Sequence, residues 1–262
     1  MALEKSEAIL LKAFNWSESS RTVVFFTERH GKLALIDKGG RQLSSKRGRL
    51  LQFARMELTF YTGRRESTGY IKDAAVIQLF DLGGDGGLGR LAYGSAACEL
   101  LYSLLPEHDA HPDTYRYFCT YIGCLSSAAK DGLPQLFIAF FLRVLTQLGY
   151  HPSLGNCVEC SRQPAGSMTD DFALSPDRGA LICSSCQTPG GYYIPLSGDG
   201  LVAMQSLQGA SLKEAPAVPI RYSETTLVLE CLGRFVSYLS GISGKLKSLE
   251  FLEKLKNSQL NG

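Results

Sequence analysis

The sequence predicts an α+β protein in which a small antiparallel β-barrel precedes a helical domain with a four-cysteine insertion. Short runs rich in β-branched and aromatic residues, separated by glycine or polar turns, fill residues 1–80. From residue 91 onward, apolar residues recur at helical spacing instead. Two Cys-x-x-Cys pairs interrupt that helical pattern. We therefore expect a barrel at residues 1–80, a glycine-rich linker at 81–89 and a helical domain at 90–262, with the insertion at about 152–195.

The predicted strands follow one another at a spacing of about 10–15 residues, which is typical of a small closed barrel. They cover residues 7–14, 21–27, 32–38, 50–61 and 69–80. Between the third and fourth strands, residues 39–49 contain one apolar residue, Leu43, among glycine, serine, arginine and lysine. We expect a basic loop there.

The linker and the helices come next. Residues 81–89 are rich in glycine but lack the Gly-Lys-Ser/Thr end of a phosphate-binding loop, so we interpret them as a hinge. Helices are expected at 91–105, 114–130, 134–148, 201–207, 225–239 and 246–255. The helix at 134–148 is apolar nearly all round, which predicts a buried central helix. Its one charge, Arg143, predicts a buried ion pair, with contact to a partner as the alternative.

Positive charge is concentrated in the predicted barrel. The whole chain has a net charge of +2, but residues 1–75 carry 14 Lys and Arg against 8 Asp and Glu. Residues 29–65 hold ten basic residues and two acidic ones, Asp37 and Glu57. Charge segregated in this way creates a positive field whose natural partner is a polyanion. A solvated basic face without a partner is the alternative.

The four inserted cysteines predict a metal site. Cys157-x-x-Cys160 and Cys183-x-x-Cys186 are separated by 22 residues. Each pair can place two sulfurs on one tetrahedral ion, so the two pairs complete a four-thiolate zinc ribbon with one structural ion. Redox-active thiols and metal-free packed thiols are the alternatives. The remaining cysteines are expected in the core, and they are Cys98, Cys119, Cys124 and Cys231.

We find no pattern of a catalytic site, and we expect a protein that is not an enzyme. No Gly-x-Ser-x-Gly elbow or His-Glu-x-x-His motif occurs. The longest apolar run is seven residues, far below the roughly 20 that span a membrane. The first seven residues include Glu4 and Glu7 where a signal peptide has positive charge, so we expect a cytoplasmic protein.

Two blocks of residues resemble the RecO family of bacterial DNA-repair proteins. The first runs from Arg21–Thr27 through Gly31-Lys32-Leu33 to the basic segment 38–47, although Gln42-Leu43 stands where that family often has further basic residues. The second joins Phe140–Tyr150, Pro152-x-Leu154 and Cys157-x-x-Cys160. Together the two blocks extend the resemblance over nearly the whole chain.

The resemblance implies an oligonucleotide-binding (OB) fold for the barrel and the function of a recombination mediator. Such proteins bind single- and double-stranded DNA, anneal complementary strands and bind the single-strand-binding protein. With RecR, and sometimes RecF, they help to load RecA onto coated single strands at the nucleoid. They need no nucleotide and no membrane.

Lys and Arg side chains of the barrel are the candidate DNA contacts, because they neutralise phosphates and release counterions. We rank the loop residues Arg41, Lys46, Arg47 and Arg49 first, and Lys32, Lys38, Arg64 and Arg65 second. Candidate base-stacking residues are Phe25, Phe26, Phe53, Phe60 and Tyr61, although most of them are expected in the barrel core.

Two other functions remain open on the sequence. The basic barrel of an interaction scaffold would bind acidic protein tails without annealing DNA. A zinc-ribbon protein of transcription or translation would prefer RNA, because the 2′-hydroxyl distinguishes the two nucleic acids.

Overall fold

A computed structural model describes residues 2–15, 18–40, 50–63, 68–84, 86–164 and 171–241, together with 247, 248, 250, 251 and 254. The chain forms two compact units, one of residues Met1–Gly83 with Cys98–Ser126 and one of Gly84–Ala97 with Ser127–Gly262. The predicted division into residues 1–80, 81–89 and 90–262 stays a prediction. Among the described helices, none combines the length and the hydrophobicity that a membrane-spanning helix requires.

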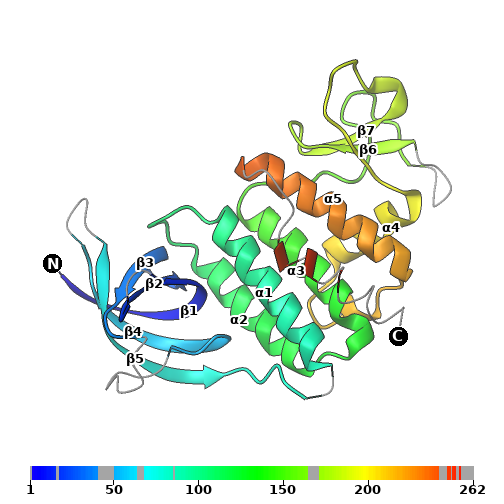
Figure 1. The fold of residues 1–262 in the computed structure, drawn as a ribbon. Coiled ribbons are helices and arrows are strands. Elements are labelled where there is room, and N and C mark those ends of the chain that lie inside the picture. The colour runs from blue at the N-terminus through cyan, green and yellow to red at the C-terminus, as the bar shows by residue number, and fades with distance from the viewer. Residues whose placement is uncertain are drawn as a thin grey trace. The chain divides into compact units, whose positions relative to one another are not determined.

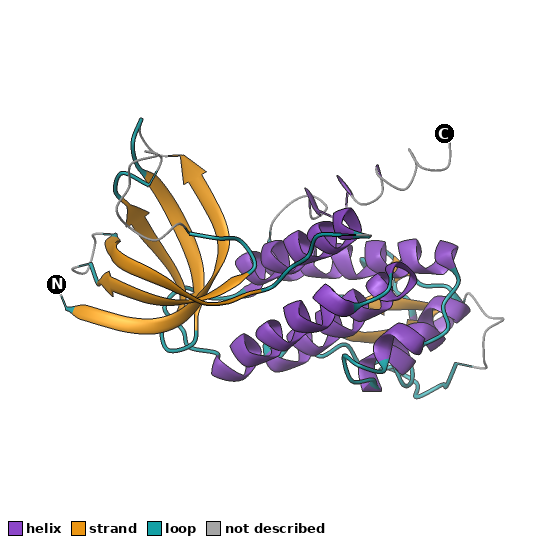
Figure 2. Ribbon diagram, turned by 90° about the horizontal axis from the view of Figure 1, so that it is seen from below, coloured by secondary structure: helices purple, strands orange, loops and turns teal. Residues whose placement is uncertain are grey.

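Five strands form a closed barrel in the order β1-β2-β3-β5-β4 (Figures 1 and 2). They are β1 (Leu3–Asn15), β2 (Arg21–Thr27), β3 (Gly31–Asp37), β4 (Ala54–Tyr61) and β5 (Gly69–Leu79). Strand β1 pairs with both β2 and β4, and an irregularity between Leu10 and Lys12 bends it. The β3–β5 pair is parallel and the other pairs are antiparallel. The barrel has the expected OB-fold.

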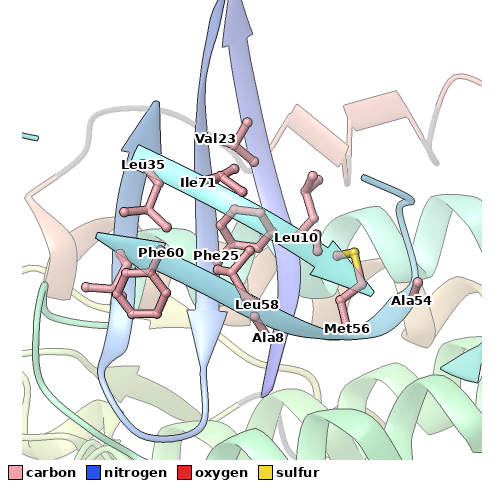
Figure 3. Packing of buried hydrophobic residues seen from close by; sticks show 12 residues of the cluster. Ala8, Leu10, Val23, Phe25, Leu35, Ala54, Met56, Leu58, Phe60 and Ile71 are labelled. Carbon is pink, nitrogen blue, oxygen red and sulfur yellow. The ribbon is translucent and has the colours of Figure 1, made fainter. Parts of the chain in front are cut away.

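The barrel closes around an apolar core, because alternate residues of each strand point inward. In β3 the pattern is strict: Leu33 and Leu35 are buried while Lys32, Ala34 and Ile36 are partly exposed. Figure 3 shows ten labelled side chains of this core, among them the rings of Phe25 and Phe60. Two residues of the segment that follows the predicted basic loop, Leu50 and Leu51, pack against the same cluster.

The second half of helix α1 (Gly87–Leu104) and helix α2 (Pro112–Ser127) belong to the same compact unit as the barrel. The rings of Phe26 and Tyr115 meet edge to face with centroids 5.5 Å apart. The thiol of Cys98 donates to the carbonyl of Leu10 over 3.8 Å. Thus these helices cover the outer side of β1 and β2, where Val24 and Phe26 are buried although they lie outside the barrel core.

In the second unit, helix α3 (Leu133–Gln147) is the most deeply buried, as the sequence predicts, with Pro134 in its first turn. It contacts α4 (Gly198–Gly209) and α5 (Tyr222–Ser240). Arg143 is exposed, so the predicted buried ion pair is wrong: one position of the helix does face solvent. Cys98 and Cys231 are buried as expected, whereas Cys119 and Cys124 are half-buried.

The four-cysteine segment forms a small antiparallel sheet in the order β7-β6-β8. Its strands are β6 (Phe172–Ser175), β7 (Ala180–Cys183) and β8 (Ile194–Pro195).

Short 3-10 helices lie at Lys130–Gly132, Ser184–Cys186 and Ala215–Ala217. Of the helix expected at 246–255, the structure describes residues 247, 248, 250, 251 and 254, and all of them are helical.

Candidate metal centre and nucleic-acid interface

The two Cys-x-x-Cys pairs converge on one point. The sulfurs of Cys157, Cys160, Cys183 and Cys186 all lie within 4.8 Å of one another, and those of Cys160 and Cys183 are 3.7 Å apart. In a tetrahedral site with Zn–S bonds of about 2.3 Å, neighbouring sulfurs are about 3.8 Å apart. The cluster therefore has the dimensions of a four-coordinate thiolate site.

Strand β7 positions both pairs. Cys183 is its last residue, and Cys186 ends the 3-10 turn that follows. The first pair is attached to the same strand, because the amide of Val158 donates to the carbonyl of Leu181 over 2.9 Å. Four protein ligands leave no open coordination position, so an ion held here would be structural.

Two thiols of the cluster differ in how readily they ionise. Burial opposes ionisation of Cys157, but backbone amides of Cys183, Cys160 and Glu159 donate to its sulfur and lower its pKa to about 6. Hydrogen bonds to the sulfurs of Cys183 and Cys160 hold the Cys186 thiol protonated and raise its pKa to about 12. Sulfurs this close cannot all be anionic unless a cation compensates their charge. The four cysteines can hold a metal ion.

A row of cross-strand partners crosses all five strands of the barrel. Phe14 of β1 pairs with Thr22 of β2, and Thr22 pairs with Ile36 of β3. Ile36 pairs with Tyr70 of β5, which pairs with Tyr61 of β4. Residues paired in this way lie on the same face of a sheet. The neighbouring residues point into the core, so this row lies on the outer face of the barrel and carries aromatic side chains at both ends.

Two exposed lysines lie over the tyrosines of this row. The Nζ atom of Lys38 is 4.6 Å from the centroid of the Tyr70 ring, and that of Lys72 is 6.0 Å from the Tyr61 ring. The two tyrosine rings are themselves 4.8 Å apart and tilted by 31°. This outer face thus combines basic and aromatic groups, as surfaces that bind single strands do.

Lys32 has a different environment. Its ammonium group donates to the carbonyl of Tyr102, near the C-terminus of α1, over 2.9 Å. Burial lowers the pKa of Lys32, and the nearby carboxylate of Glu107 opposes that effect. The side chain satisfies a helix-end carbonyl, where a cation is favourable. The ammonium group of Lys32 is therefore engaged within the protein and is not proposed as a phosphate contact.

The predicted stacking residues are mostly core. Phe25, Phe26, Phe53 and Phe60 are buried, which excludes them from contact with a base, whereas Tyr61 is half-buried. Tyr70 and Lys72 are not among the residues predicted from the sequence, although strand alternation around Ile71 places both on the outer face. The remaining predicted DNA contacts lie outside the described residues, and they are Arg41, Lys46, Arg47, Arg49, Arg64 and Arg65.

The chain is thus a modular OB-fold protein. In the sequence its barrel is followed by a helical domain, and four clustered thiols lie in a segment inserted into that domain. Residues 1–80 match the family described as Recombination protein O N terminal, and residues 87–250 match Recombination protein O C terminal. The chain therefore belongs to the RecO family.

Curated relatives agree with this assignment. The DNA repair protein RecO of Symbiobacterium thermophilum is 27% identical over 261 residues, which cover 99% of this chain and 100% of the relative. That of Pelobacter propionicus is 30% identical over 97% of this chain and 98% of its own length. The Desulforudis audaxviator protein of the same name is 32% identical over 70% of each chain.

Proposed function

We propose that this protein is a recombination mediator in DNA repair. It binds single- and double-stranded DNA, anneals complementary strands and helps to load RecA onto single strands coated by the single-strand-binding protein. Its protein partners would be RecR, possibly RecF, and the single-strand-binding protein, in the cytoplasm at the nucleoid. The observation that carries this proposal is the match of both RecO family descriptions, over residues 1–80 and 87–250.

The chemistry of the barrel supports DNA as the ligand. An OB-fold barrel binds strands through a groove with basic rims and aromatic platforms. Lys38 and Lys72 are exposed next to two tyrosines, and the sequence adds the basic loop 39–49 and the pair Arg64-Arg65. We propose phosphate contacts by Lys38, Arg41, Lys46, Arg47, Arg49, Arg64 and Arg65.

Annealing requires no bond to be made or broken, so we propose a function without a catalytic residue or a nucleotide. Two complementary strands repel each other through their phosphates. A cluster of Lys and Arg side chains screens that repulsion and holds both strands without reading their sequence. Base pairing then supplies the free energy of the product.

We propose that Cys157, Cys160, Cys183 and Cys186 hold one zinc ion. Thiolate ligands in a tetrahedral set favour zinc, and the sulfur separations agree with Zn–S bond lengths. The ion would hold the ribbon in its fold and take no part in annealing.

The test is an annealing assay with complementary strands coated by the single-strand-binding protein, over a series of salt concentrations. Replacing Arg41, Lys46, Arg47 and Arg49 by Ala should weaken DNA binding for all sequences and slow annealing. On single strands, each lost phosphate contact should reduce the slope of log affinity against log salt by about 0.7.

A matched control removes the same charge from exposed positions outside the barrel, by alanine at Lys130, Arg143, Lys213 and Arg234. Equal loss of affinity in the control would contradict a specific role of the barrel loop. Binding of acidic peptides without annealing would favour the scaffold, and tighter binding of RNA than of DNA would favour the RNA-binding function.

A further inference from the structure

We propose that Tyr61 and Tyr70 form a stacking site for one unpaired nucleobase on the outer face of the barrel, with Lys38 and Lys72 at its sides. The proposal rests on the DNA-binding function proposed above. It adds which side chains contact a base and how that contact serves annealing.

The position of the two tyrosines makes them a pair. Tyr61 is the last residue of β4 and Tyr70 the second of β5, and the strand register places them directly opposite each other. Their ring centroids are 4.8 Å apart with an interplanar angle of 31°. Because Phe60 and Ile71 fill the core on the inner side, both tyrosines lie on the outer side of the barrel wall.

Each tyrosine ring is covered by an ammonium group that can leave it. Lys38 lies over Tyr70 and Lys72 over Tyr61, and both lysines are exposed. A cation–π contact in water is weak, whereas an aromatic ring stacked on a base excludes water from a larger area. We infer that a base replaces the ammonium group on the face of the tyrosine ring, and that the ammonium group then contacts a neighbouring phosphate.

Stacking of this kind selects for unpaired bases. In duplex DNA both faces of a base are covered by its neighbours. The duplex would therefore have to unstack before one of its bases could contact the tyrosine rings. A base held by its face on Tyr61 and Tyr70 still presents its Watson–Crick edge to solvent. The site would therefore hold a single strand in a form that is ready to pair with its complement.

The test compares three ligands: a short oligothymidylate, an abasic oligomer of the same length, and a duplex. The double variant Tyr61→Leu/Tyr70→Leu should bind oligothymidylate about fivefold or more weakly, since the loss of one stacked base lowers the affinity by at least about that factor. Its affinities for the abasic oligomer and the duplex should change little, and its salt slope should stay that of the wild type. The double variant with Phe at both positions should restore most of the lost affinity.

Tyr192→Leu is the matched control, because Tyr192 is 50% exposed and stacked on Tyr238 at 5.9 Å, outside the barrel. If wild-type protein binds oligothymidylate and the leucine double variant binds it equally well, the stacking site is wrong. The same holds if Tyr192→Leu has the same effect, or if the loss is as large on the abasic oligomer. If the wild type binds none of the three ligands, the proposed function itself fails. Thermal unfolding of the phenylalanine and leucine variants checks that the barrel is folded.

Discussion

The barrel and the four-cysteine ribbon are stabilised in different ways. Among the described residues of the barrel, twelve are buried in one apolar cluster that all five strands share. The ribbon has strands of four, four and two residues, and its two Cys-x-x-Cys segments meet at a single group of sulfurs. Loops of the barrel can therefore carry charge for binding without affecting the core, whereas loops of the ribbon are part of what holds it together.

The largest effect is expected from loss of the metal in the ribbon. Removing the metal with a chelator, or the substitution Cys183→Ser, should unfold the ribbon, because binding of a structural zinc contributes about 10–16 kcal/mol in small zinc domains. Hydrogen exchange should show loss of protection at residues 153–164 and 171–195, while the barrel strands stay protected. Metal analysis should show one zinc per chain before treatment. Cys119→Ser, a half-buried thiol outside the cluster, is the control and should keep the metal.

The next largest effect concerns the barrel core. Phe25→Ala should lower the free energy of unfolding by about 3–5 kcal/mol in urea denaturation, because it leaves a cavity in a closed barrel. Phe14→Ala, in the same barrel, should cost much less, since Phe14 is 40% exposed and Phe25 is 0% exposed. The ribbon should keep its metal in both variants. Equal destabilisation by the two substitutions would contradict the placement of the core.

A smaller effect on DNA binding is expected from single substitutions of Lys38 and Lys32, two residues that the sequence alone does not distinguish. Lys38→Ala should weaken DNA binding a few-fold and reduce the salt slope by about 0.7, since one phosphate contact is lost. Lys32→Ala should leave the slope unchanged, because that ammonium group is engaged with the carbonyl of Tyr102. Affinities measured over a salt series check both, and a lower slope for Lys32→Ala would return that residue to the interface.

The smallest effect lies where the ribbon is joined to the helices. Ser197 follows β8 and caps helix α4, with its hydroxyl accepting from the amide of Gly200 over 3.1 Å and donating to Glu224. Ser197→Ala should cost about 1 kcal/mol in thermal unfolding, the usual effect of losing an N-cap. DNA binding and metal content should not change. Ser206→Ala, an exposed position inside the same helix, is the control and should cost less.

The strands and the metal ligands could be predicted because their signals are local or periodic. Strand alternation and turn residues placed all five barrel strands, with β2 at the predicted bounds Arg21–Thr27. The cysteine spacing identified the four sulfurs that lie within 4.8 Å. Arg143 shows the limit of such reasoning: a helix that is apolar nearly all round still has one position in solvent, and periodicity does not say which.

By itself, the sequence determined the order of the barrel, helices and ribbon, the concentration of basic residues at 29–65 and the identity of the four clustered cysteines. Only the tertiary structure decided that Tyr61 lies beside Tyr70, that four of the predicted stacking rings are buried, and that Lys38 is exposed while Lys32 binds a helix end. The physical reason is that composition and spacing act along the chain, whereas exposure and ring contacts depend on strand register and on what packs against each strand.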